Sequence, residues 1–440
     1  MLTFEDPNMM CEAPNAVLNF LPERDALEKY VEAYCSGPLI NIFPLLTREH
    51  FFHTIDTAYG KTSSPPWRVL VARFAVCAIS TFFSAMIGHL LRIDMPPLDI
   101  TKLAQTSYAL FARWPSFPPT IEALQGSLAL YFFETARGDT QKVDFLVSMC
   151  SRLVYNMGCH MTSQHQSDSS ARRDHMRDLF WLCYTIDKDH TFRTGRPPML
   201  VDDHCDLTLP PRYLAYASTP DAIDHLFPTD LRLSMLKAKA HRDLYSVASH
   251  RKSDIEIIKT IRELDEELDQ WRSSVPASVR PSLAHFDSNN MTEWTIVNLH
   301  HLMIRLEYHH VTSIIHQASS RCIAWADSAE MVAEGISSSV AVSVAASRAT
   351  LLSLVGMSGS FPRPFIWALL FYPMSAILTI FCSILDEPLS PTAQSDTRLL
   401  EQMALIMTPD FQDPIADVNI NAHAQVGFAR EVARLAKSAN

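Results

Sequence analysis

Five histidines lie close together near residue 300 and are the first place to look for a metal site. They are His300, His301, His309, His310 and His316. On a helix, three of them share one face at steps of eight and seven residues. Two helical turns span ~11–12 Å, which is too far for two ligands of one ion, because such ligands favour a spacing of four. We therefore interpret these histidines as structural or surface residues.

Two other short runs contain residue types that could do chemistry. Residues 202–206 read Asp-Asp-His-Cys-Asp, but they lack the alternating ligands and the glycine of a calcium-binding loop. We interpret them as a solvated loop that caps the next segment. Residues 356–360 read Gly-Met-Ser-Gly-Ser and resemble half of a nucleophile elbow. They lack the second glycine two positions after the serine, and no strand precedes them.

Asp187, His190 and His204 are the remaining candidates for acid–base catalysis. Asp187 and His190 lie one turn apart near the end of a predicted helix, where a structural hydrogen bond is the usual outcome. The sequence has no P-loop and no Gly-x-Gly-x-x-Gly motif. An enzyme on an all-helical scaffold is therefore the weaker alternative, and we expect neither catalytic nor metal-binding residues.

The cysteines and the charge argue against a built-in DNA-binding module. The 9 cysteines are dispersed, and the closest pair, Cys150 and Cys159, is nine positions apart. A zinc cluster needs thiolates that converge within ~2.3 Å of a metal. The 37 basic and 48 acidic residues give a net charge of −11, and basic residues gather only in doublets such as Arg172-Arg173. We expect an intracellular chain without bound zinc, for which direct DNA binding is doubtful.

The elements that must position these residues are predicted to be helices. Apolar residues recur at steps of three and four, for example from 140 to 157, where Gly158 can supply a left-handed exit. Only 11 of the 440 residues are glycine, against a usual ~7%, which disfavours Gly-rich nucleotide-binding folds. The predicted helices are 25–35, 67–93, 99–113, 121–136, 140–157, 170–192, 230–250, 255–271, 292–318, 328–356, 397–407 and 420–438. The prediction is all-α: one large multi-helix domain whose helices are separated by Pro-rich loops.

One apolar run raises the question of a membrane. Residues 365–385 carry no charge, and 21 residues are long enough to cross a bilayer. A second run, 74–91, is flanked closely by Arg73 and Arg92. Pro373 interrupts the first run, and buried helices of large domains have the same hydropathy. A membrane protein is thus a less favoured alternative, and we expect no membrane contact.

Residues 171–210 contain one recognisable order of residue types. A basic turn is followed by Phe-Trp, a Tyr, an Asp, a Thr four residues on, and Gly-Arg-Pro. These positions are Arg172, Arg173, Phe180, Trp181, Tyr184, Asp187, Thr191, Gly195, Arg196 and Pro197. This order resembles the middle homology region of fungal-specific transcription factors, the regulatory domain that usually follows a binuclear zinc cluster. The resemblance extends over roughly residues 28–385, and its specificity rests on order and spacing together.

The resemblance implies a transcriptional regulator of a metabolic or secondary-metabolite gene set that acts in the nucleus. It also implies partners: the transcription machinery, a DNA-binding partner regulator, a homo- or heterodimer, or a small-molecule effector. The family's zinc cluster needs six cysteines in a short basic segment, and this sequence contains no such segment. We therefore expect a partner to supply DNA recognition. The nuclear location rests on resemblance, because no basic import signal is visible.

The predicted organisation is an N-terminal tail (1–24), a regulatory domain (25–385, core 40–318), a linker (386–396) and a C-terminal helical segment (397–440). Within the last segment, residues 409–418 interleave acidic and apolar residues like a disordered activation segment. An ordinary surface loop is the favoured alternative.

We expect the motif to be structural. Asp187 and Arg196 bracket the helix exit, and an Arg–carboxylate pair with Asp187, Asp202 or Asp203 would fix its geometry with bidentate bonds. Buried charges need partners on both sides, which favours scaffold residues over ligand contacts.

Overall fold

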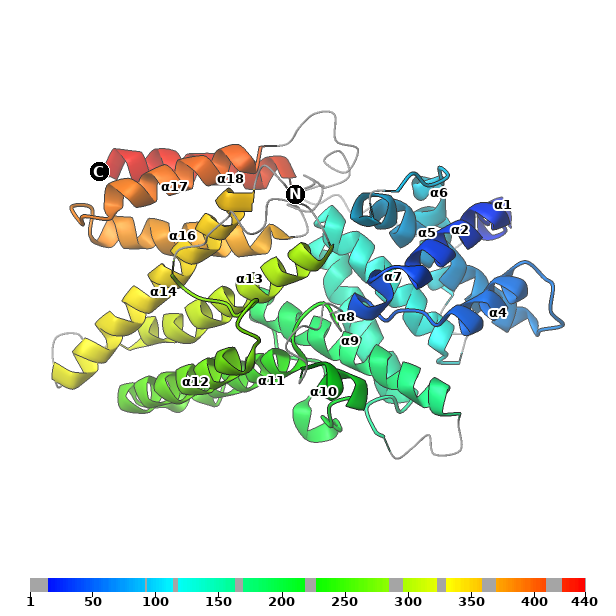
Figure 1. Ribbon diagram of the computed structural model, residues 1–440, viewed down its shortest axis with the longest axis horizontal. Coiled ribbons are helices and arrows are strands. Elements are labelled where there is room, and N and C mark those ends of the chain that lie inside the picture. The colour runs from blue at the N-terminus through cyan, green and yellow to red at the C-terminus, as the bar shows by residue number, and fades with distance from the viewer. Residues whose placement is uncertain are drawn as a thin grey trace. The chain divides into compact units, whose positions relative to one another are not determined.

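The computed structural model describes residues 15–91, 93–113, 118–162, 169–217, 227–284, 296–322, 330–357, 369–408 and 422–439 (Figure 1). All regular secondary structure in these ranges is helical, which confirms the predicted all-α class. The chain divides into two compact units. Unit 1 comprises Met1–Thr135, Thr140–Ile186 and Met199–Pro210, and unit 2 comprises Ala136–Asp139, Asp187–Pro198 and Pro211–Asn440.

Unit 1 is organised around one long apolar helix, α5. The helices that begin in this unit are α1 (Asn15–Leu18), α2 (Arg24–Ser36), α3 (Leu39–Ile42), α4 (Arg48–Ala58), α5 (Pro66–Leu91), α6 (Ile100–Phe111), α7 (Ile121–Arg137), α8 (Thr140–Asn156), α9 (Ser170–Thr194) and the 3-10 helix η3 (Asp202–His204). α5 packs against α2, α4 and α6. Its Phe83 is fully buried and stacks on Tyr34, with 5.0 Å between the ring centroids. A helix that is apolar on all sides needs neighbours on all sides, which α5 has.

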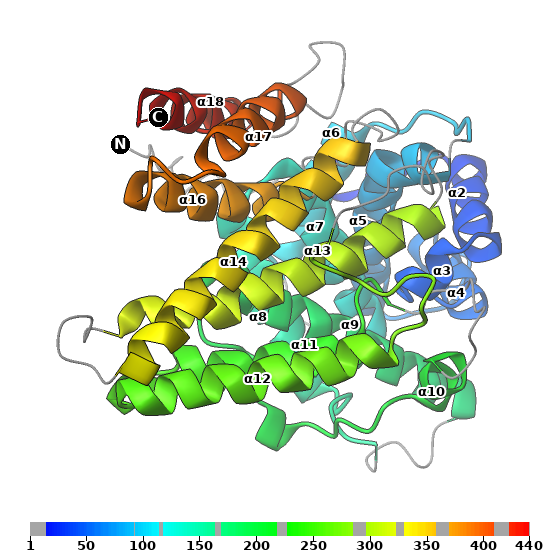
Figure 2. The ribbon, with the colours of Figure 1, turned by 60° about the vertical axis from the view of Figure 1, so that its left-hand side comes forward.

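Unit 2 contains the remaining helices and the last turns of α7 and α9. They are α10 (Pro211–Ala217), α11 (Leu231–Ala240), the π-helical turn η4 (His241–Tyr245), η5 (Ser249–Arg251), α12 (Asp254–Ser274), α13 (Ile296–Gln317), η7 (Ala318–Arg321), α14 (Glu330–Met357), α16 (Phe371–Asp386), α17 (Ala393–Ile406) and α18 (Ala422–Ala439). α13 and α14 lie side by side in Figures 1 and 2, and α16, α17 and α18 pack together beside them. Two apolar clusters form its core, one around Leu302 and Ile377 and one around Ile261 and Val311.

Most predicted helices are present, with ends that shift by a few residues. Gly158 adopts the predicted left-handed conformation, with a φ of 70°. The described helices α1, α3, α4, α10 and α16 were not among the predicted ones. α1 lies within the predicted tail 1–24, with Leu18 buried, and α17 begins at Ala393 within the predicted linker 386–396. α4 was not predicted, because its polar and histidine-rich sequence obscures the periodicity of its buried residues.

The membrane candidates differ from the predicted one. Within the described ranges, Pro66–Gly88 in α5 and Ala333–Met357 in α14 are long and apolar enough to cross a bilayer, with 72% and 56% of their apolar windows buried. Buried core helices have the same length and composition. The predicted run 365–385 is not one spanning helix as far as it is described, because α16 begins at Phe371 and has 16 residues. Residues 365–368 lie outside the described ranges.

Unit 2 encloses a lysine in its core. The side chain of Lys237 on α11 is 1% exposed, and its ammonium contacts the carboxylates of Asp189 on α9 and Glu307 on α13. The hydroxyl of Tyr372 on α16 donates a hydrogen bond to Glu307, and Arg193 donates to that hydroxyl over 3.4 Å. Burial lowers the pKa of Lys237, whereas the charge of Asp189 and its hydrogen bond raise it. Charged groups from three helices and the Tyr372 hydroxyl from a fourth therefore meet at one buried point, which we call the Lys237 cluster.

Replacing Lys237 with methionine should destabilise unit 2 strongly. The change leaves two carboxylates without their cation, and breaking a buried ion pair costs ~3–5 kcal/mol. Lys239 on the same helix pairs with Glu267, and both side chains are more than a third exposed. Lys239→Met is the matched control, with an expected loss of ~0–1 kcal/mol. The measurement is the free energy of unfolding in urea, and equal losses in the two variants would contradict the cluster's importance.

Two glycine substitutions should have opposite effects on stability. A Cβ at Gly126 of α7 would lie 2.6 Å from the Phe74 ring on α5, so Gly126→Ala should cost ~1–3 kcal/mol by overpacking. A Cβ at Gly427 of α18 meets nothing within 4 Å, so Gly427→Ala should gain up to ~1 kcal/mol of helix propensity. Thermal unfolding followed by circular dichroism checks both signs. A melting temperature that does not fall in Gly126→Ala would refute the close approach of the two helices.

Candidate functional site

The aromatic residues of the sequence motif form part of the core of unit 1. Phe180, Trp181 and Tyr184 on α9 are all 0% exposed. Trp181 packs edge-on against both other rings at centroid distances of 5.3 Å, and the guanidinium of Arg177 lies 4.5 Å from the Phe180 ring centroid. The hydroxyl of Tyr184 donates a hydrogen bond to Asp202 over 2.9 Å. These contacts hold the 202–206 segment against α9.

The 202–206 segment is braced by hydrogen bonds rather than arranged around an ion. Arg177 donates to the carbonyl oxygens of Cys159 and Asp206, over 3.2 and 2.7 Å. Hydrogen bonds from Thr162 and Thr208 hold the pKa of Asp206 well below its usual range. Within the part of the chain that the structure describes, no group of three or more His, Cys, Asp or Glu is placed to hold a metal.

The second half of the motif lies in unit 2. Asp187 is 1% exposed and accepts a hydrogen bond from the ammonium of the adjacent, equally buried Lys188 over 3.2 Å. Thr191 is buried, and Gly195 takes a left-handed conformation with a φ of 69°. The side chains of Arg196 and Pro197 are exposed, and Arg173, near the start of α9 in unit 1, is half-buried. The ion pair between Arg196 and a carboxylate at the helix exit stays a prediction.

The other candidates from the sequence are distributed over both units. Asp187 and His190 belong to unit 2, whereas His204 belongs to unit 1. Residues 358–360 of the elbow-like run 356–360 and the acidic stretch 409–418 lie outside the described ranges.

The histidines of α13 each have surroundings of their own. Nε2 of His300 donates to the carbonyl oxygen of Phe227 over 3.0 Å, and Nε2 of His309 donates to that of Ser282 over 3.0 Å. Nε2 of His316 lies 3.3 Å from a carboxylate oxygen of Asp265. Burial lowers the pKa of His309 to about 4 and, with the charges of Lys237 and Arg193, that of His310 to about 3. His301 also has a pKa of about 4, because of burial and the charge of Arg305.

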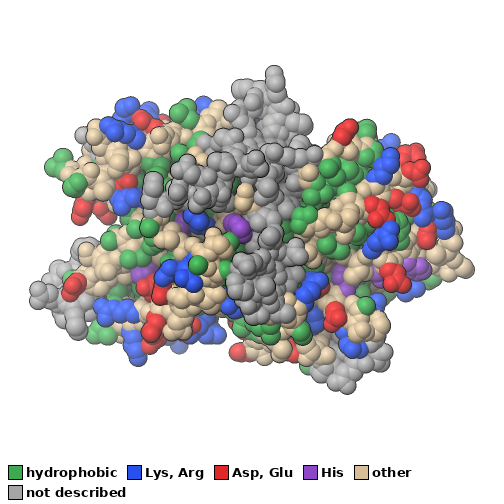
Figure 3. Space-filling view, in the orientation of Figure 1, with side chains coloured by type: hydrophobic (Ala, Val, Ile, Leu, Met, Phe, Trp, Pro, Cys, Tyr) green, Lys and Arg blue, Asp and Glu red, His purple; other side chains and the backbone are tan. Residues whose placement is uncertain are grey.

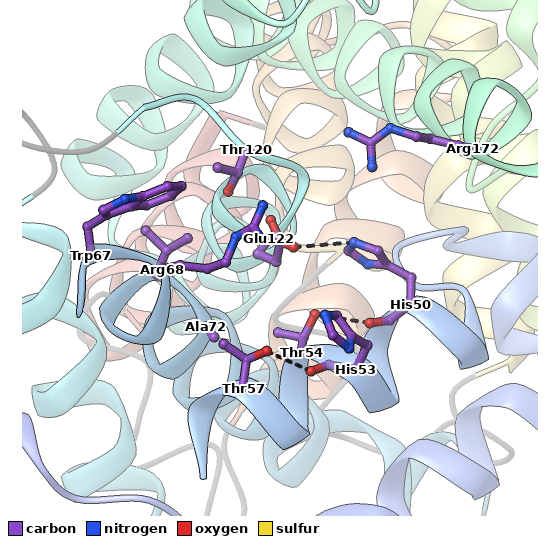
Figure 4. Close-up of a pocket in the computed structure, with 11 residues that line it drawn as sticks. His50, His53, Thr54, Thr57, Trp67, Arg68, Ala72, Thr120, Glu122 and Arg172 are labelled. Atoms are coloured by element: carbon purple, nitrogen blue, oxygen red, sulfur yellow. Dashed lines mark hydrogen bonds and ion pairs between the residues drawn. The ribbon is translucent and has the colours of Figure 1, made fainter. Parts of the chain in front are cut away.

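The structure also forms a pocket that the sequence did not predict. It lies in unit 1, has a volume of about 200 Å³, and draws its walls from α4, α5, the start of α7 and the first turn of α9 (Figure 4). The lining residues are His50, His53, Thr54, Thr57, Trp67, Arg68, Val71, Ala72, Thr120, Glu122 and Arg172. No local spacing reveals them, because they come from four distant segments. Only the basic doublet Arg172-Arg173 drew attention in the sequence to one of these lining residues.

An ion pair forms one wall of this pocket. Nε2 of His50 lies 3.3 Å from a carboxylate oxygen of Glu122, and both side chains are about a quarter exposed (Figure 4). Burial raises the pKa of Glu122, but the hydrogen bond and charge of His50 outweigh burial and bring the pKa to about 2. Glu122 is therefore ionised at neutral pH. Behind it, burial and the charges of His50 and Arg172 lower the pKa of His175 to about 3.

A second pocket adjoins the first. Its volume is about 370 Å³, and it shares Trp67, Arg68, Thr120, Glu122 and Arg172 with the first. Its additional lining residues are mostly apolar: Pro118, Pro119, Ile121, Asn156, Met157 and Met176. We call the two together the Arg68/Arg172 hollow. It combines cationic groups with an apolar wall and suits binding rather than catalysis.

Comparison with known proteins bears on both units. Residues 31–273 match the family described as "Fungal specific transcription factor domain". The chain is similar to two ABC-transporter-regulating transcription factors, with 25% identity over 90% of the chain for that of Aspergillus oryzae and 27% over 90% for that of Aspergillus fumigatus. It is also similar to the Fusaridione A cluster transcription factor fsdR of Fusarium heterosporum, with 24% identity over 81% of the chain and 66% of the relative.

The share of each chain that a match covers decides which conclusion it supports. The chain spans 45% of the length of each Aspergillus relative. The family match covers more than half of the chain and includes the α9 motif, most of unit 1 and the Lys237-bearing helix of unit 2. The named relatives are transcription factors and not enzymes. The chain therefore belongs to the fungal-specific transcription factor domain family.

Proposed function

We propose that the chain is the regulatory body of a nuclear transcriptional regulator that controls an export or biosynthetic gene set. The proposal is supported by the family match over residues 31–273 and by the names of the relatives. Two are named as regulators of ABC transporters and one as the transcription factor of the Fusaridione A cluster. In this role the helical units receive a signal and contact the transcription machinery, a second copy or a related regulator.

We further propose that a zinc-cluster element outside these 440 residues provides DNA recognition. Sequence-specific binding needs several Lys or Arg residues along one surface to neutralise phosphates. On the face shown in Figure 3, basic and acidic side chains of the described residues are interspersed. The exposed Arg48, for example, pairs with Glu32, and Arg434 pairs with Glu431.

The regulatory role predicts an effect on transcription once the chain is brought to a promoter. We expect a fusion of the 440-residue chain to a heterologous DNA-binding domain to raise or lower a reporter of intermediate basal activity. The DNA-binding domain alone is the control. A fusion that is present in the nucleus at the same level as the control and leaves the reporter unchanged would refute the proposed function.

The division of labour predicts a second result. We expect the purified 440-residue chain to contain no stoichiometric zinc and to bind DNA weakly and without sequence preference. Metal analysis and selection from random duplexes at physiological salt are the measurements. A recovered consensus site that is bound tightly without a partner would show that the chain recognises DNA itself.

A further inference from the structure

We propose that the Arg68/Arg172 hollow binds a small organic monocarboxylate with an apolar or aromatic body, and that this anion is the effector of the regulator. The site and the ligand class are assigned from the volume of the hollow, its charged side chains and its apolar lining residues. The effector role, by contrast, rests on the proposed function.

The charge balance of the hollow favours a single negative charge. Two guanidinium groups, those of Arg68 and Arg172, line both pockets, and Glu122 is the one carboxylate among the lining residues. The formal charges of Arg68, Arg172 and Glu122 sum to +1. In the view of Figure 4, Arg68 lies next to Glu122 and Arg172 lies above His50. A ligand with one negative charge is attracted by both guanidinium groups, whereas the second charge of a dianion is repelled by the nearby carboxylate of Glu122.

The donor groups fit a carboxylate. A guanidinium presents parallel N–H groups that match the two oxygens of a carboxylate. The hydroxyl of Thr120, which lines both pockets, donates to the carboxylate of Glu122 and helps to hold it in the wall. Glu122 is already paired with His50, so it fixes the wall and repels a second anionic group.

The rest of the hollow fits an apolar body. Trp67 lines both pockets, and Ile121, Met157 and Met176 line the larger one. An indole face and flexible thioethers make favourable contacts with a flat ring. The larger pocket alone, at about 370 Å³, lies within the ~300–1,000 Å³ of small-molecule sites.

Calorimetric titration of the full purified chain at neutral pH tests the ligand class. The probes are benzoate, cinnamate and octanoate, with benzamide and cinnamamide as neutral counterparts and phthalate as a dianion. We expect at least one monocarboxylate to bind and its amide to bind at least ~10-fold more weakly, because the amide cannot form charge-assisted bonds. Equal affinity for an acid and its amide, or no binding by any of the three monocarboxylates, would overturn the proposal.

Variants locate the site. We expect Arg68→Gln and Arg172→Gln each to weaken the binding of that carboxylate by ~10-fold or more. Arg152→Gln is the matched control, because Arg152 is an exposed arginine of unit 1 that is not among the lining residues. Glu122→Gln should reduce the discrimination against phthalate, which a merely structural role would not do. Melting curves without ligand show whether each variant is folded.

The binding result is independent of the reporter result. A chain that binds the carboxylate through Arg68 and Arg172 but never alters the reporter refutes the proposed function and leaves the site intact. A chain that alters the reporter but binds no monocarboxylate refutes the site alone. The Arg152→Gln control should keep the preference for the carboxylate over its amide. A full loss of that preference in this control would also contradict the assignment of the site to the hollow.

Discussion

The burial of one ammonium group constrains the arrangement of unit 2 more than any apolar contact does. A lysine that is removed from water without a partner loses several kcal/mol of solvation, so Lys237 must meet carboxylates wherever it is buried. Asp189 and Glu307 supply them from two other helices, and Tyr372 connects a fourth. A shift that separated these groups would leave an uncompensated charge in the interior, which costs ~3–5 kcal/mol. The last turns of α9, which carry Asp187 and Thr191 of the motif, are therefore fixed in place by charge.

The motif thus identifies the family without being the site. Its aromatic residues are buried in unit 1, and Asp187 and Thr191 are buried in unit 2, so none of these side chains faces a ligand. Arg172, which precedes the aromatic part of the motif, is exposed and lines the hollow instead. The packed part of the motif thus adjoins, at Arg172, the residues that line the hollow.

The sequence predicted the helices because their periodicity is local. It predicted the left-handed exit at Gly158 and the start of α12, where Ser253 and Glu256 form a capping box. It missed α4, which mixes histidines, threonines and charges. The Lys237 cluster was beyond reach, because a lysine between apolar residues of a helix looks like any exposed lysine until three other helices are in place. The hollow was missed for the same reason: His50, Arg68, Glu122 and Arg172 are separated by 18 to 54 positions.

The two long apolar helices have a consequence for synthesis of the chain. As each emerges from the ribosome, it presents an apolar stretch of 23 or 25 residues with the length of a membrane segment. α5 finds α2 and α4 already made and α6 soon after, so its partners are local. α14 packs on the preceding α12, α13 and η7, but two further partners, α16 and α17, are still to come. Apolar surface that waits for later segments binds chaperones or aggregates. Truncation after α14 should therefore yield a chain that chaperones retain, whereas the 440-residue chain should not be retained.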